Sequence, residues 1–124
     1  MFKEDIYNLT QNNTYFRKVL HTGKKAQLVI MSVLKGSEIG EEAHPNTDQI
    51  LVFVDGRAKA ILNGEEKDVS RNDVLFVPAG TVHNIINLGD GDLKLYTIYA
   101  PPEHLDGTIH KTREDALHEH DVKK

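Results

Sequence analysis

Two segments of the chain hold glycine, proline, histidine and asparagine at fixed spacings. The first is GSEIGEEAHPNTDQILVFVDG, from Gly36 to Gly56. The second is PAGTVHNIIN, from Pro78 to Asn87. Glycine and asparagine are the residues that best tolerate a left-handed backbone, and proline cannot donate to a strand ladder. These positions therefore predict short strands separated by sharp bends.

The two segments resemble the paired motifs of the cupin superfamily, whose members are small double-stranded β-helix (jelly-roll) barrels. The second cupin motif reads G-x5-P-x-G-x2-H-x3-N. Its spacings are kept by Pro78, Gly80, His83 and Asn87, and Asn72 stands at the position of the first glycine. That exchange is conservative, because asparagine also adopts left-handed turns. The resemblance covers roughly residues 26–99 and implies an all-β cupin barrel.

The first cupin motif reads G-x5-H-x-H-x3,4-E-x6-G, and the sequence departs from it at two positions. Every spacing is kept if Glu42 replaces the first histidine, His44 is the second, and Gln49 replaces the glutamate. A rival register would take His44 and Asn46 as the two histidines. It leaves one residue too few before Gln49, so we reject it.

The resemblance implies a metal-binding quartet made of Glu42, His44, Gln49 and His83. Imidazole is the commonest metal donor, a carboxylate is a hard oxygen donor, and a glutamine amide oxygen is a weaker one. Phosphomannose isomerases, which share the barrel, also mix such residues around one zinc. The set suits a divalent zinc, iron, manganese or nickel ion. The alternatives are an ordinary surface carboxylate at Glu42 and a structural hydrogen bond at Gln49.

Composition removes several other classes of function. The chain has 124 residues, enough for one domain with a core of its own, and no cysteine, which excludes disulfides, thiolate zinc sites and a thiol nucleophile. A formal charge of −4 with interspersed signs leaves no basic surface for nucleic acid. The N-terminal residues lack the apolar run of a signal peptide, and no stretch approaches the ~20 apolar residues of a membrane helix. We therefore expect a cytoplasmic protein.

The chain divides into three parts by pattern. Residues 1–25 are expected to form a lead-in and a first strand, residues 26–100 the barrel, and residues 101–124 a loop and a short helix capped by Thr112 and Asp115. Asn63-Gly64 is the clearest hairpin turn. The expected strands cover 15–21, 26–35, a very short one at 42–44, 48–54, 57–62, 65–69, 74–77, 82–88 and 93–100.

The tail carries four of the seven histidines. Their polar surroundings predict that His110, His118 and His120 are solvated. His104 follows the last strand closely and could fold back over the mouth of the barrel, so its role stays open.

Two functions fit this sequence. One is a small metal-dependent enzyme, isomerase-like or dioxygenase-like, in which the metal acts as a Lewis acid on a small oxygenated metabolite. The other is a non-catalytic barrel that binds a small sugar-like molecule without metal. The enzyme is the first hypothesis and the metal-free barrel the alternative. The sequence does not choose between isomerase-like and dioxygenase-like chemistry, and it assigns no catalytic residue.

The parity of one strand predicts a homodimer. If Gln49 faces the barrel interior, then Ile50, Val52 and Val54 face outward. Exposed apolar rows of this kind are costly, and a second copy could cover them. The rival is that residues 1–21 fold across the same face.

Overall fold

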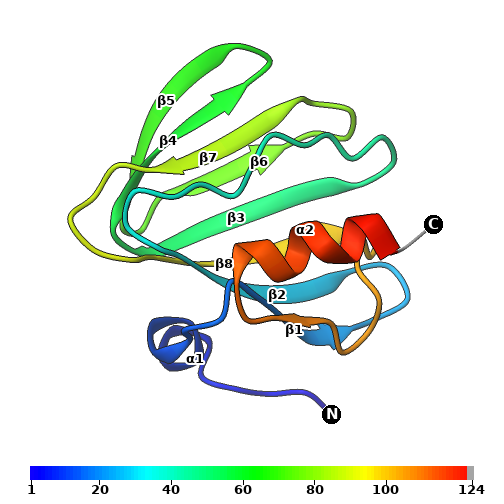
Figure 1. The fold of residues 1–124 in the computed structure, drawn as a ribbon. Helices are drawn as coiled ribbons and strands as arrows, with labels where there is room; N and C mark the ends of the chain where they lie inside the picture. The colour runs from blue at the N-terminus through cyan, green and yellow to red at the C-terminus, as the bar shows by residue number, and fades with distance from the viewer. Residues whose placement is uncertain (123–124) are drawn as a thin grey trace.

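Nine strands and two helices make up the fold, which was obtained as a computed structural model that describes residues 1–122, with side chains through residue 119 (Figure 1). In chain order the elements are α1 (Ile6–Asn12), β1 (Arg17–Thr22), β2 (Gln27–Val33), β3 (Asp48–Asp55), β4 (Arg57–Leu62), β5 (Glu65–Ser70), β6 (Val74–Val77), β7 (His83–Asn87), β8 (Leu93–Ala100), β9 (Ile109–His110) and α2 (Arg113–Val122). None of the described helices is long and apolar enough to cross a membrane.

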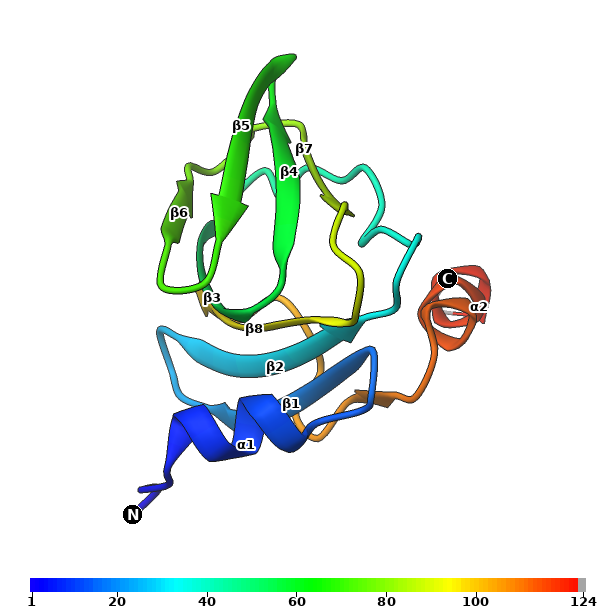
Figure 2. The same cartoon turned by 90° about the vertical axis from the view of Figure 1, so that its left-hand side faces the viewer.

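The strands form two antiparallel sheets that face each other (Figure 2). The larger sheet has the order β6-β3-β8-β2-β1-β9, and the smaller has the order β5-β4-β7. The core lies between them, because alternate residues of β3, β7 and β8 point inward and are buried. Leu51, Phe53, Ile85 and Leu95 are each at most 1% exposed. This arrangement confirms the predicted all-β fold with a short C-terminal helix.

Two turn positions show why the motif residues are needed. Asn72, at the glycine position of the second motif, has φ 76°, a left-handed value that asparagine tolerates. Gly56 has φ 95°, and a Cβ atom there would lie 3.2 Å from the carbonyl oxygen of Asp92. A larger residue at position 56 would therefore push the β3–β4 turn away from the start of β8.

The segment between β2 and β3 closes one side of the barrel. Its backbone pairs with β7 at two isolated bridges, Glu38 with Ile86 and Glu42 with His83. The Glu42 and His83 amides each donate to the other's carbonyl at 2.9 Å. The short strand expected at residues 42–44 is therefore a single bridge, which fixes these two residues side by side.

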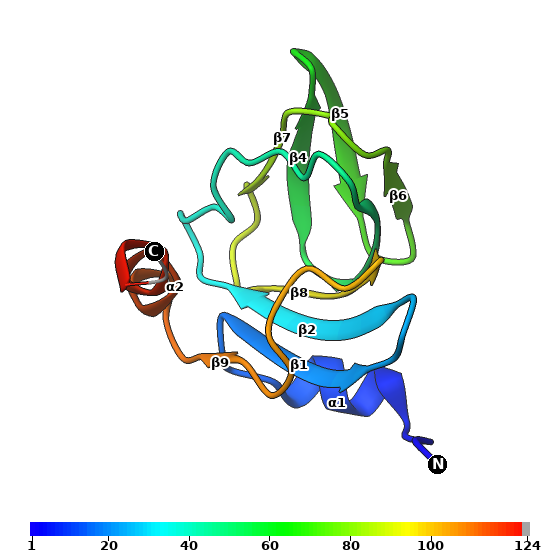
Figure 3. The same ribbon diagram turned by 90° about the vertical axis from the view of Figure 1, so that its right-hand side faces the viewer.

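The helices lie outside the barrel on different sides (Figures 2 and 3). α1 packs against β2, β3 and β8 of the larger sheet. α2 lies beside the open side of the barrel, where the Nε–H of Arg113 donates to the carbonyl of Ile39 at 3.3 Å. The predicted cap is confirmed, since Thr112 Oγ1 accepts from the Asp115 amide at 3.0 Å.

The tail adds a strand that the sequence did not predict. β9 pairs with β1, with Arg17 opposite His110 and Lys18 opposite Ile109. The tail is therefore not a loop that runs directly into a helix. It extends the larger sheet before α2 begins.

Candidate metal centre

Three of the four predicted ligands meet inside the barrel. One donor atom each from Glu42, His44 and His83 lies within 4.8 Å of the others. His44 Nε2 is 3.7 Å from Glu42 Oε1, and the two imidazole rings are 5.5 Å apart between centroids. The bridge between residues 42 and 83 brings two of the side chains together. His44 lies two residues beyond Glu42 and so points to the same face.

A hydrogen bond orients the His83 ring, and an ion-pair contact orients the His44 ring. His83 Nδ1 lies 2.9 Å from the carbonyl oxygen of Thr81, and His44 Nδ1 lies 3.3 Å from Glu103 Oε2. Since a carbonyl and a carboxylate can only accept, both Nδ1 atoms carry a hydrogen. Both Nε2 atoms are buried and have no hydrogen-bond partner among the described residues. Carbonyl and carboxylate partners of this kind typically orient metal-binding histidines.

Gln49 faces the interior from β3 and is 2% exposed. Its Nε2 donates to Thr97 Oγ1 at 3.1 Å, and the Thr97 hydroxyl donates onward to the Ile50 carbonyl at 2.9 Å. This chain fixes the amide orientation and leaves Gln49 Oε1 buried without a partner in the described part of the protein. Gln49 therefore makes the structural hydrogen bond that we considered, and it still offers an open oxygen donor.

The donor set fits a divalent ion. Two donors that each lie ~2.1 Å from one ion at a tetrahedral angle are ~3.4 Å apart. The 3.7 Å between His44 Nε2 and Glu42 Oε1 is close to that separation. Two open imidazole nitrogens and one carboxylate, all inside a protein, form a combination that zinc, iron, manganese and nickel accept.

Electrostatics favour charge on both Glu42 and His44. Burial favours the neutral form of Glu42, but the His44 ring and the charge of Arg17 outweigh it and lower the pKa of Glu42 below its ordinary value. Burial also opposes protonation of His44, yet the carboxylates of Glu42 and Glu103 raise its pKa above the ordinary value. The site thus holds its carboxylate ionised.

Two further side chains border the trio of Glu42, His44 and His83. The Tyr99 ring is fully buried and meets the His44 ring edge-on at 5.7 Å and the His104 ring at 5.0 Å. Burial raises the pKa of the Tyr99 phenol, so the hydroxyl keeps its proton. His104 does fold back over the barrel, and burial together with the charge of Arg17 lowers its pKa to about 3.

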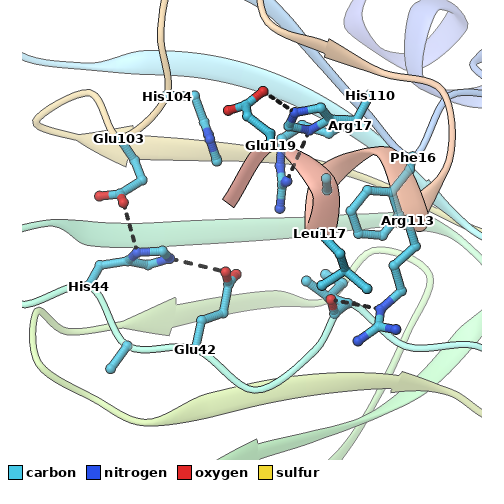
Figure 4. A pocket seen from close by; sticks show the side chains of 13 residues that line it. Phe16, Arg17, Glu42, His44, Glu103, His104, His110, Arg113, Leu117 and Glu119 are labelled. Carbon is cyan, nitrogen blue, oxygen red and sulfur yellow. Dashed lines mark hydrogen bonds and ion pairs between the residues drawn. The ribbon is translucent and has the colours of Figure 1, made fainter. Parts of the chain in front are cut away.

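A cavity of about 170 Å³ opens beside Glu42 and His44 and lies under α2 (Figure 4). Its apolar wall includes Phe16, Ile39 and Leu117, and its polar wall includes Arg17, Glu103 and Glu119. Such a volume holds a ligand of a few non-hydrogen atoms. The helix therefore limits the size of any molecule that reaches Glu42 and His44 through this cavity.

The structure corrects the prediction for one tail histidine. His110 is only 5% exposed, because β9 places it between Arg17 and Glu119. His118 is exposed, as predicted, and the side chain of His120 lies outside the described residues.

Sequence reasoning did not find Arg17, Glu103 or Glu119. They lie outside both motifs, and the only sequence signal near them was the position of His104 just after the last strand.

Comparison with known proteins places this sequence in a family. The model of the cupin domain (Cupin_2) matches residues 29–99. The uncharacterised protein YrkC of Bacillus subtilis is 45% identical over 94% of this chain and 66% of its own length. The uncharacterised protein L612 of Acanthamoeba polyphaga mimivirus is 42% identical over 81% of this chain and 65% of its own. The chain thus spans about two thirds of the length of these relatives.

A solved structure shows the same fold over almost the whole chain. The crystal structure of BH2720 from Bacillus halodurans superposes with a TM-score of 0.93 and 39% identity, and the match covers 94% of this chain and 93% of that one. Motifs, barrel and family match agree, and the chain belongs to the cupin domain family.

Proposed function

We propose that the protein is a metal-binding cupin in which Glu42, His44 and His83 hold one divalent ion and Gln49 Oε1 is a fourth, weaker donor. The observation that carries the proposal is the convergence of three donor atoms within 4.8 Å, two of them imidazole nitrogens without another partner among the described residues. Buried polar atoms are otherwise almost always satisfied. A bound ion would satisfy them together.

The proposed activity is that of an enzyme, isomerase-like or dioxygenase-like, on a small oxygenated metabolite. A bound divalent ion would supply Lewis-acid polarisation of a substrate oxygen. The chain's own residues do the rest. Glu103 orients His44, Thr81 orients His83, and Tyr99, whose phenol stays protonated, packs edge-on against the His44 ring. Arg113, Ala116, Leu117 and Glu119 of α2 form one wall of the cavity.

A second candidate is a barrel that binds a small sugar-like molecule without metal. One observation favours it: His44 lies 3.7 Å from Glu42 and 3.3 Å from Glu103, so its charged form already has two carboxylate neighbours. In this candidate, Glu42, His44 and His83 line the binding site and form hydrogen bonds with the hydroxyl groups of the sugar-like ligand.

Metal analysis separates the two candidates. The protein is purified without a histidine tag and treated with chelator. It is then dialysed against zinc, iron(II), manganese or nickel, and its metal content per chain is measured by elemental mass spectrometry. We expect about one ion per chain, lost in His83→Ala but kept in His118→Ala, whose histidine is exposed. A wild-type chain that takes up no ion but binds monosaccharides would overturn the metal proposal and support the second candidate.

The proposal also includes a cytoplasmic homodimer. Support for the dimer comes from apolar side chains on the outer face of the larger sheet, including the exposed Val74 and Phe76 of β6. The test of the dimer is given with the whole molecule in the Discussion.

A further inference from the structure

Arg17 is a buried cation without a carboxylate partner. Its side chain is on β1, and the residue is 5% exposed. Among the described residues, no carboxylate oxygen lies within 4.0 Å of its guanidinium nitrogens, and its Nε has no hydrogen-bond partner. A buried charge is costly unless another charge or hydrogen bonds compensate it. The burial of Arg17 therefore requires a group that compensates its charge.

The tail holds this guanidinium in place. Arg17 Nη1 lies 3.3 Å from His110 Nδ1, and its Cζ lies 5.1 Å from the centre of the Phe16 ring. A guanidinium can only donate, so His110 Nδ1 accepts and His110 Nε2–H donates to Glu119 on α2. Arg17 is thus fixed from β9 and α2, while its Nε remains open.

The guanidinium lines the same cavity as two of the three candidate metal ligands, Glu42 and His44. Arg17, Glu42 and His44 all line that cavity, and Figure 4 shows Arg17 extending from beside His110 toward the space above Glu42. Its charge is felt by Glu42, Tyr99 and His104. A metal ion bound to Glu42 would take up the charge of that carboxylate, which leaves Arg17 available to another anion.

We propose that Arg17 binds the carboxylate of a small monoanionic ligand whose other oxygen faces the metal centre. The inference rests on the proposed metal site and names the substrate class: a hydroxy or keto carboxylic acid of a few carbon atoms, as the cavity of about 170 Å³ permits. The planar guanidinium matches a carboxylate in shape.

The charge of the cavity favours a monoanion over a phosphate dianion. Three carboxylates line it, from Glu42, Glu103 and Glu119. The second guanidinium on the wall, from Arg113, already donates to the Ile39 carbonyl. Arg113 is only half-buried, whereas Arg17 is buried and its Nε has no hydrogen-bond partner among the described residues, so Arg17 is the cation that lacks compensation.

The test is a titration followed by nuclear magnetic resonance on zinc-loaded protein, with zinc content measured on each sample. The probes are 3-hydroxypropionate, the neutral 1,3-propanediol of similar shape, and inorganic phosphate. We expect wild type to bind 3-hydroxypropionate at least tenfold more tightly than the diol and more tightly than phosphate. Arg17→Met should lose this preference with unchanged zinc content. Arg71→Met, which alters an exposed arginine that does not line the cavity, should keep it.

The outcomes separate the two proposals. Wild type without zinc uptake refutes the metal centre, and the same titration on zinc-free protein still tests Arg17. Zinc-loaded wild type without a carboxylate preference, tighter binding of phosphate, or an Arg17→Met variant that keeps the preference refutes the carboxylate site alone. If Arg17→Met does not fold, Arg17→Lys replaces it and should weaken 3-hydroxypropionate binding at least threefold, because an ammonium lacks the planar fork.

Discussion

Glu103 controls the orientation of His44, although it lies outside both motifs. Its Oε2 lies 3.3 Å from His44 Nδ1 as an ion pair, and this contact leaves His44 Nε2 directed at Glu42. Removing such a partner typically costs 10–100-fold in metal affinity. We therefore expect Glu103→Ala to weaken zinc binding by roughly that factor, measured by competition with a chromophoric chelator.

Matched variants make the Glu103 test specific. Glu103→Gln keeps an acceptor oxygen and should lose less affinity than Glu103→Ala. Glu41→Ala removes an exposed carboxylate next to Glu42 and should leave zinc affinity unchanged. Equal affinities for wild type and Glu103→Ala would show that Glu103 does not orient His44.

His104 should make the protein less stable in acid. Its folded-state pKa is about 3 because of burial and the nearby Arg17, while the unfolded value is about 6.5. Below pH 6.5 the unfolded chain binds a proton that the folded chain does not, so stability is present above that pH and is lost as the pH falls. From pH 7 to pH 5 this loss is about 2 kcal/mol.

Urea unfolding of chelator-treated protein measures the effect. Between pH 7 and pH 5 the free energy of unfolding should fall by about 2 kcal/mol more in wild type than in His104→Gln. His118→Gln, at an exposed position, should behave like wild type. The same pH dependence in wild type and His104→Gln would assign the acid sensitivity to other groups.

Among the elements, α2 depends on its N-terminal cap. Thr112 Oγ1 accepts from the Asp115 amide at 3.0 Å, and Asp115 Oδ2 accepts from the Thr112 amide at 3.3 Å. Loss of such a cap costs about 1 kcal/mol. Thr112→Ala should therefore destabilise the protein by about that amount and speed amide exchange in α2 more than elsewhere, whereas Thr14→Ala, at an exposed site before β1, should do neither. Uniform exchange rates in Thr112→Ala would contradict a local role for the cap.

The barrel elements could be predicted because their signals are local. Alternation in β3, β7 and β8 determines which side chains are buried, and Asn63-Gly64 determines the hairpin between β4 and β5. The motif spacing likewise identified Glu42, His44 and His83, which the structure brings together.

The tail could not be predicted in the same way. Arg17 and His110 are 93 residues apart in sequence, and nothing in the polar run around His110 indicates a partner on β1. The pattern of polarity shows that a residue can be solvated, but it does not show which backbone will pair with it. This explains why the solvated reading of His110 was wrong, and why Arg17 and Glu103 were missed.

At the scale of the whole molecule, apolar side chains form two rows across the outer face of the larger sheet. The register of β6, β3, β8 and β2 aligns Phe76, Ile50, Ile98 and Leu28 in one row and Val74, Val52, Tyr96 and Ile30 in the other. These rows test the two covers expected for this face, which are a second copy of the chain and the N-terminal segment. α1 packs against β2, β3 and β8, so the N-terminal segment covers part of the face, as the rival prediction held.

The β6 end of these rows remains uncovered in the single chain. Val74 is 66% exposed and Phe76 is 53% exposed. Burial of each such side chain stabilises by ~1.5–3 kcal/mol, and a two-fold contact would bury Val74 and Phe76 of both chains. We therefore expect sedimentation at low micromolar concentration to give twice the chain mass of 14.0 kDa. Phe76→Lys and Val52→Lys should shift the protein to monomer while the far-ultraviolet circular dichroism stays the same. Leu105→Lys, at a 66% exposed position in the tail, should remain dimeric. A wild-type mass of 14.0 kDa, unchanged by Phe76→Lys, would rule the dimer out.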